Sequence, residues 1–277
     1  MMRILTPAVL LAMCTGCLSL DFLVFSAPTT DEYVLDEEVL DSEDVEFVTF
    51  ETPDGFTLHG VWVRGDNPQP PLIYFHGNST KLDDTWERLA YYRSWGYDVF
   101  AVDYRGFGMS DGPATYEGVF ETDGLATVNY VSESTGVATE DIPWVSISMG
   151  SGVAAHTNDE VDAQAVILHA MFPDTDDLAD DGTGNDLPMG WFFEEDYDNI
   201  EATRQMTSPV FVIHGLLDDY INGPVYGPMV FEAAPEPKAF WQPEDVAHSD
   251  LWDVRGEEFR RRSREFFDEF GSVPPLP

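Results

Sequence analysis

The chain has 277 residues, enough for one large α/β core or for two small domains. Hydrophobic residues make up 43% and aromatic residues 13%, which excludes an intrinsically disordered protein. The 52 Asp and Glu residues against 13 Lys and Arg give a formal net charge of -39, which repels polyanions and argues against nucleic acid as a partner. An acidic, lysine-poor surface suits a saline habitat. An ordinary acidic secreted protein remains the alternative.

The N-terminus, MMRILTPAVLLAMCTGCLSL, predicts a signal peptide over residues 1–16. Arg3 precedes an apolar run from Ile4 to Met13 that is too short to span a membrane. The end of this segment resembles a bacterial lipoprotein signal, which would make Cys17 the lipidation site. Cys14 stands where that pattern usually has Leu, so an ordinary secretory signal stays open. We therefore expect an exported protein, held in the cell envelope by a lipid at Cys17 or secreted if Cys17 is unmodified.

Residues 17–44 are acidic and are predicted to form a tether or a loosely packed lead-in. After them, VEFVTF and FTLHGVWV alternate in polarity around the turn Pro53-Asp54-Gly55, as an antiparallel hairpin does. Continuous apolar runs follow, and such runs are typical of parallel strands covered on both faces by helices. The predicted strands are 71–75, 98–102, 143–147, 165–169, 209–213 and KAFWQ at 238–242; the predicted helices lie near 82–95, 115–134, 149–157, 223–234 and 256–270. Residues 45–277 are thus expected to form one α/β domain with a doubly wound, mostly parallel sheet and an N-terminal antiparallel hairpin.

Residues 170–208 interrupt the alternation of strands and helices with an insertion that contains eleven carboxylates. An insertion of this length is expected to cover the carboxyl edge of the sheet as a cap. Its aromatic residues Trp191, Phe192 and Phe193 are candidates for substrate contact, with packing of the cap onto the domain as the alternative. A calcium loop within DLADDGTGND is rejected because Ala179 and Pro188 stand where ligands are required.

Two serines compete for the role of nucleophile. Ser110 lies in the literal G-x-S-x-G pattern, whereas Ser148 lies in SISMGSG, where Ser146 replaces the first glycine. A nucleophile elbow requires a strand, a sharp turn and a helix in direct succession. Ser148 follows a predicted strand and precedes a predicted helix, but Ser110 lies in a glycine-rich loop followed by Pro113. The context therefore predicts Ser148 and not Ser110.

A serine nucleophile needs a base and an acid that orients the base. His248 lies in EDVAHSDL, between the last predicted strand and the final helix, where a loop can bring an imidazole to the sheet edge. The segment VIHGLLDDYI offers Asp218 or Asp219 after another strand. The chain order is then Ser, Asp, His.

Five segments together resemble the successive signatures of the α/β-hydrolase family, in the serine-hydrolase subgroup with an H-G-N oxyanion loop. They are YFHGN (74–78), DYRGFGMSDG (103–112), SISMGSG (146–152), VIHGLLDDYI (212–221) and AHSDL (247–251). The likeness runs from about Val45 to Phe270. It implies Ser148 as nucleophile, His248 as base, Asp218 as acid, and the backbone N–H groups of Asn78 and Met149 as oxyanion hole. It also implies a structural role for Asp103 and Arg105.

The resemblance implies a hydrolase that cleaves small-molecule esters, of the carboxylesterase or lysophospholipase-like kind, through an acyl-enzyme. A peptidase or amidase with the same triad is the first alternative, and a non-catalytic envelope binding protein is the second. We expect a monomer that needs no metal and no organic cofactor.

Overall fold

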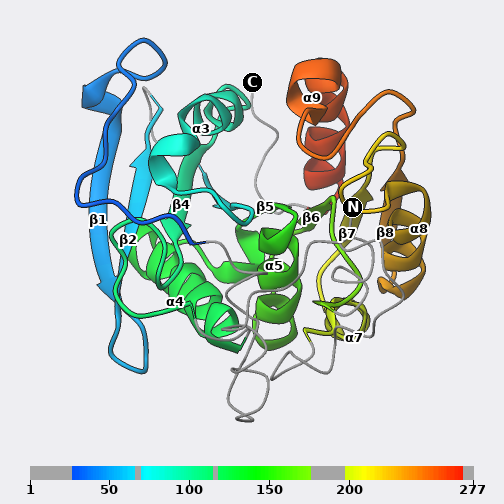
Figure 1. Cartoon of the computed structure of the whole chain (residues 1–277), viewed down its shortest axis with the longest axis horizontal. Helices are drawn as coiled ribbons and strands as arrows, with labels where there is room; N and C mark the ends of the chain where they lie inside the picture. The colour runs from blue at the N-terminus through cyan, green and yellow to red at the C-terminus, as the bar shows by residue number, and fades with distance from the viewer. Residues whose placement is uncertain (1–26, 66–69, 115–117, 176–196, 271–277) are drawn as a thin grey trace, which may run out of the picture.

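The computed structural model describes residues 27–65, 70–114, 118–175 and 197–270, and the structural statements below concern these residues. Eight strands form one sheet in the order β1-β2-β4-β3-β5-β6-β7-β8 (Figure 1). The strands are β1 Val45–Glu51, β2 Thr57–Val63, β3 Pro71–Phe75, β4 Asp98–Asp103, β5 Trp144–Ile147, β6 Val166–His169, β7 Val210–Ile213 and β8 Lys238–Trp241. The strands β1, β2 and β4 pair antiparallel, and all later pairings are parallel.

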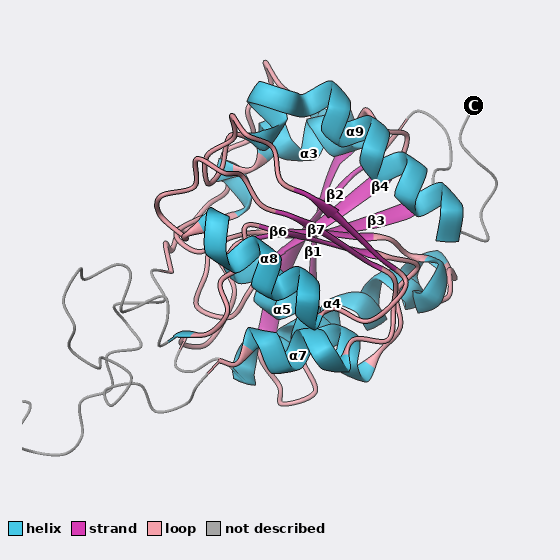
Figure 2. Cartoon of the chain, turned by 90° about the vertical axis from the view of Figure 1, so that its right-hand side faces the viewer, coloured by secondary structure: helices cyan, strands magenta, loops and turns pink. Residues whose placement is uncertain are grey.

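Helices cover both faces of the sheet because the parallel strands are apolar on both sides. The helices α3 (Trp86–Arg93) and α9 (Leu251–Phe270) pack on one face, and the remaining four pack on the other (Figure 2). Those four are α4 Gly118–Thr135, α5 Met149–Glu160, α7 Asn199–Gln205 and α8 Gly223–Ala233. An apolar core therefore lies on each side of the sheet. Because β3 to β8 run parallel, their carboxyl ends lie at one edge of the sheet.

The predicted fold class is confirmed: the sheet is mostly parallel, it begins with an antiparallel hairpin, and it alternates with helices. The last helix begins at Leu251, before the predicted start near 256. Arg255 leaves helical geometry (φ -132°) and divides the helix into two parts, and the predicted range matches the second part. Within the predicted cap, α7 is a helix that the sequence pattern did not indicate, because its seven residues are too few for a clear period.

The described part of the predicted lead-in, residues 27–44, packs against the domain. Leu40 is 3% exposed, and Trp86 Nε1 donates a hydrogen bond to the Val34 carbonyl at 2.8 Å. Thr29 forms a bridge with Gly108. This part of the chain differs from a free tether because apolar side chains are interspersed among its carboxylates.

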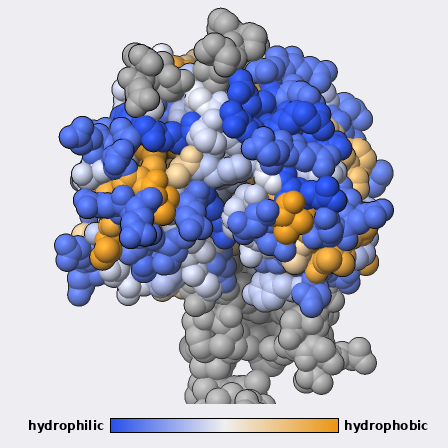
Figure 3. All heavy atoms as spheres, turned by 90° about the horizontal axis from the view of Figure 1, so that it is seen from above, coloured by the Kyte–Doolittle hydropathy of each residue, from blue (hydrophilic) through white to orange (hydrophobic). Residues whose placement is uncertain are grey.

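The face of the molecule seen from above is mostly hydrophilic (Figure 3). Viewed from above, hydrophilic residues predominate and hydrophobic residues form small, separate patches (Figure 3). Among the described residues, none of the helices combines the length and the apolar character that crossing a bilayer requires. Cys17 and residues 1–16 lie outside the described residues, so the predictions made for them stay predictions.

Candidate active site

Ser148 occupies a tight turn between β5 and α5. Its backbone angles are φ 55° and ψ -125°, a conformation that residues other than glycine adopt only where the surrounding structure enforces it. The Ser148 N–H donates to the His169 carbonyl at 2.8 Å, which ties the turn to the neighbouring strand β6. These are the strand, sharp turn and helix that a nucleophile elbow requires.

Close packing of the backbone explains the small residues around this turn. A Cβ at Gly150 would lie 2.7 Å from the carbonyl carbon of Phe75 and closer still to two carbonyl oxygens of β3 and its following loop. Ser146, which replaces the usual glycine, is accommodated because its hydroxyl donates to the Ile167 carbonyl and contacts the Ser151 hydroxyl at 3.1 Å. The substitution therefore leaves no unpaired hydroxyl beneath the turn.

Asp218 and His248 form a hydrogen-bonded pair. Asp218 follows β7 and is 2% exposed, and its Oδ2 lies 2.8 Å from His248 Nδ1. The other carboxylate oxygen accepts N–H donors from Tyr220 at 3.1 Å and Ile221 at 2.9 Å. Because Nδ1 is engaged by the carboxylate, Nε2 is the His248 nitrogen left to exchange a proton with a substrate or nucleophile.

A second histidine binds the same carboxylate. His214 Nε2 lies 3.0 Å from Asp218 Oδ2 and 3.1 Å from the Ile221 carbonyl, so this nitrogen carries a proton and donates. Burial raises the pKa of Asp218, but the hydrogen bonds from His214 and His248 outweigh it and hold that pKa well below its usual range. Asp218 is therefore an anion that can stabilise an imidazolium. Sequence reasoning missed His214 as a partner, although it precedes Asp218 by four residues in the H-G-x-x-D pattern.

The sheet brings the nucleophile turn and the Asp-His pair to one edge. Ile147 is in register with His169, His169 with Ile213, and Ile213 with Trp241, so β5 to β8 end side by side. His169 is buried beside this edge, and its pKa is held well below its usual value first by burial and then by the nearby His214 and His248. No hydrogen bond joins the Ser148 hydroxyl to His248 within the described part of the chain. Catalytic hydrogen bonds of this kind often form only in the substrate complex.

The two predicted oxyanion donors border the Ser148 turn. Met149 is the first residue of α5, so its N–H has no acceptor within the helix. Asn78 follows Gly77, at which a Cβ would lie 3.4 Å from the Ser148 Cβ. The loop after β3 therefore passes directly against the serine, which itself immediately precedes the N-terminus of α5.

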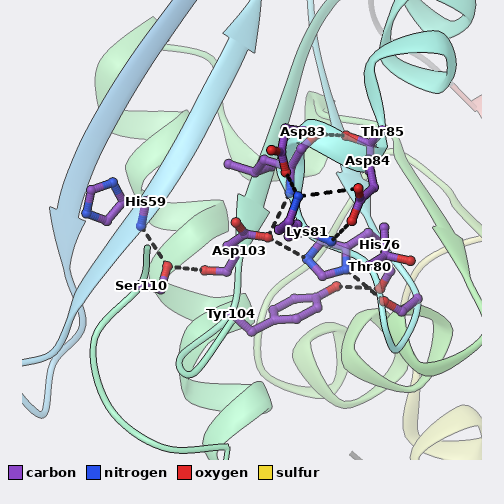
Figure 4. A network of polar contacts seen from close by, with 12 residues as sticks. His59, His76, Thr80, Lys81, Asp83, Asp84, Thr85, Asp103, Tyr104 and Ser110 are labelled. Carbon is purple, nitrogen blue, oxygen red and sulfur yellow. Dashed lines mark hydrogen bonds and ion pairs between the residues drawn. The ribbon is translucent and has the colours of Figure 1, made fainter. Parts of the chain in front are cut away.

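Ser110 has a different environment from Ser148, and Figure 4 shows the contacts of Ser110. Its hydroxyl donates to the Asp103 carbonyl at 2.6 Å and accepts the His59 N–H at 2.9 Å. These bonds fasten the glycine-rich loop to β2 and β4, on the opposite side of β3 from the Ser148 turn. The aromatic residues Trp191, Phe192 and Phe193 lie outside the described residues.

Comparison with known proteins adds evidence on the fold. No protein-family model matches the chain. The protein named "Uncharacterized protein YfhR" from Escherichia coli K12 is 25% identical over 230 residues, which is 80% of each chain. The YfhR protein of Salmonella typhi is 32% identical over 73 residues, and this match spans only 25% of that relative's length.

Solved structures match over most of the chain. The Pyrococcus furiosus esterase Pf2001 superposes with a TM-score of 0.72 at 20% identity, over 88% of this chain and 96% of that one. The α/β hydrolase GrgF from Penicillium sp. sh18 superposes with a TM-score of 0.68 at 17% identity, over 83% and 99%. The chain has the α/β-hydrolase fold. Ser148, Asp218 and His248 follow the carboxyl ends of β5, β7 and β8, the edge at which open α/β sheets generally bind ligands.

Proposed function

We propose that the protein is a serine hydrolase that cleaves carboxylic esters of small molecules. The observation that supports this most strongly is the positive-φ backbone of Ser148 at a strand-to-helix turn, on the sheet edge that also carries the hydrogen-bonded Asp218–His248 pair. The likeness in fold to the Pyrococcus furiosus esterase Pf2001 agrees with it.

In the proposed reaction, His248 Nε2 takes the proton from the Ser148 hydroxyl as its oxygen attacks the ester carbonyl. Asp218 keeps Nδ1 protonated and stabilises the imidazolium that forms. The N–H groups of Met149 and Asn78 bind the oxyanion, and losing one such donor costs about 3–4 kcal/mol of transition-state stabilisation. The imidazolium then protonates the leaving alcohol, and water resolves the acyl-enzyme by the same route. These steps need no metal and no organic cofactor.

A fluorophosphonate probe tests the proposal directly, because it reacts covalently with an activated serine. Wild type and Ser110→Ala should be labelled, and Ser148→Ala should not. A p-nitrophenyl ester series of increasing chain length, at low and high salt with Ser148→Ala as blank, reports acyl preference and any dependence on a saline medium. Amide substrates in the same assay test the peptidase or amidase alternative. Absence of labelling in wild type would favour the non-catalytic binding protein.

We propose further that the hydrolase acts in the cell envelope, anchored by a lipid at Cys17. The support is the signal-like sequence of residues 1–17 alone. Metabolic labelling with an alkyne fatty acid should mark wild type and not Cys17→Ser. Equal labelling of both would contradict the anchor, and a processed but unlabelled wild type would indicate secretion.

A further inference from the structure

The carboxylate of Asp103 contacts both ends of the loop that carries Asn78 and is hydrogen-bonded to one of them. Asp103 ends β4 and is fully buried. Its Oδ1 accepts the Leu82 N–H at 3.0 Å, and His76 Nε2 lies 3.3 Å from the same oxygen (Figure 4). His76 and Leu82 bracket the oxyanion loop, so a rotation of this one carboxylate would break its bond to Leu82 and change its contact with His76.

The position of this loop is tightly restricted beside the nucleophile. The Tyr104 hydroxyl donates to the His76 carbonyl at 3.0 Å, and the two rings are 4.5 Å apart. Gly77 then packs against Ser148: a Cβ added at Gly77 would lie 3.4 Å from the Ser148 Cβ. A small shift of the loop would therefore change the place of the Asn78 N–H relative to the oxyanion.

The second oxygen of Asp103 is bound by a residue of the lead-in. The Tyr33 hydroxyl donates to Asp103 Oδ2 at 2.7 Å and accepts the Met109 N–H at 3.1 Å. A Cβ at Gly108, whose φ is 53°, would lie 2.6 Å from both the Asp103 carboxyl carbon and the Tyr33 hydroxyl. Glycine at this position allows the loop to close over the contact.

The backbone on both sides of Tyr33 is fixed. The Gly108 N–H donates to the Pro28 carbonyl at 2.8 Å, and the Thr30 N–H donates to the Gly108 carbonyl at 3.0 Å. On the other side, the Val34 carbonyl accepts the Trp86 indole N–H. The Tyr33 ring stacks on Phe47 with centroids 5.4 Å apart. The hydroxyl is therefore held in place before any substrate binds.

The Asp103 carboxylate depends on these hydrogen bonds. Among the described residues, no Lys or Arg lies within 4.0 Å of it, and His76 is the one titratable base in contact. A buried carboxylate without a cationic partner is stable only where polar groups donate to it. Removing the Tyr33 hydroxyl would deprive Oδ2 of its side-chain donor and free the carboxylate to rotate.

We propose that Tyr33 is a positioning residue for the oxyanion loop, acting through Asp103 from the N-terminal lead-in. This inference rests on the proposed function, because it names a determinant of the same site. Its alternative is that Tyr33 only fastens the lead-in to the domain. In that case losing the hydroxyl would lower stability without a specific effect on catalysis.

The test is Tyr33→Phe, which keeps the ring and its stacking and removes the hydroxyl. The matched control is Tyr91→Phe, because the Tyr91 hydroxyl donates to the Gly256 carbonyl at 2.6 Å and ties α3 to α9, away from the loop. We expect kcat for an ester to fall about tenfold in Tyr33→Phe with KM within about twofold, because displaced oxyanion donors act on the transition state. Affinity for a trifluoromethyl ketone, whose serine adduct carries an oxyanion, should weaken by the same factor. Tyr91→Phe should change neither value, although both variants should melt at a lower temperature.

Hydrogen exchange of the peptide spanning residues 76–84 gives a readout that does not need activity. Exchange should be faster in Tyr33→Phe than in wild type and unchanged in Tyr91→Phe. Equal exchange in all three proteins, or unaltered kcat and ketone affinity in an active Tyr33→Phe, would overturn the positioning role. A wild type without Ser148-dependent hydrolysis would refute the proposed function instead, and the exchange data would still decide whether Tyr33 holds the loop.

Discussion

Gly150→Ala tests whether the close approach of α5 to β3 is required for catalysis. The added Cβ would lie 2.7 Å from the Phe75 carbonyl carbon, where carbon atoms need about 3.5–4.0 Å. The start of α5 must therefore move by about 1 Å away from the strand that leads into the oxyanion loop. A misplacement of about 1 Å costs on the order of 100-fold in rate, and overpacking of this kind costs about 1–3 kcal/mol of stability.

The assay is kcat/KM for p-nitrophenyl acetate, together with the free energy of unfolding in urea. The matched control is Gly256→Ala, because a Cβ at Gly256 has its nearest neighbour at 3.6 Å, an ordinary contact distance. We expect a loss of about 100-fold for Gly150→Ala and a change within twofold for Gly256→Ala. If Gly150→Ala loses stability but keeps kcat/KM within twofold of wild type, the reasoning is wrong.

Three further predictions concern buried charges. Asp218→Asn should lower kcat by about 10³–10⁴-fold, because His248 loses the anion that fixes its tautomer; a loss below tenfold in stopped-flow ester hydrolysis would contradict this. The Asp218 pKa is lower in the folded chain than in the unfolded one, so its contribution to stability is present above an unfolded pKa of about 3.9 and is lost as the pH falls toward the folded value. The difference in melting temperature between wild type and Asp218→Asn should therefore narrow from pH 5 to pH 3, and a constant difference would argue against an ionised Asp218. Asp123→Asn removes the charge that pairs with Arg105 at 2.7 Å, both side chains being almost fully buried; because Asp54 still pairs with Arg105, the change should cost about 1.5–3 kcal/mol in urea unfolding. Glu265→Gln, which weakens the exposed pair with Arg261, is the control and should leave stability within error of wild type.

The sheet could be predicted from sequence because its parallel strands are short runs of apolar residues with no alternation. Each of those runs pairs in the sheet, from β3 to β8. The turn at Ser148 could also be predicted from sequence, since the glycines after it indicate a helix packed very close to a strand. Both predictions depend on patterns among neighbouring residues, and such patterns can be recognised in one sequence alone.

The contacts that sequence reasoning missed are long-range. Tyr33 and Asp103 are 70 residues apart in the sequence. Nothing in the acidic lead-in indicates that its tyrosine donates a hydrogen bond to a buried carboxylate of the domain. His214 was visible as a histidine at a strand end, but its bond to Asp218 depends on how the loop after β7 curls back. Which hydroxyl or imidazole reaches a given carboxylate is decided by tertiary packing and not by residue type.

Strand β1 forms one edge of the sheet, so its outer backbone groups have no strand beside them in the described part of the chain. Glu46 and Glu51 are exposed along it. Charged side chains on such an edge discourage another copy from adding its own strand, and the net charge of -39 strengthens the repulsion between molecules. The same acidity that marks this sequence thus protects it from aggregation, and rising ionic strength weakens that protection as the Debye length shortens.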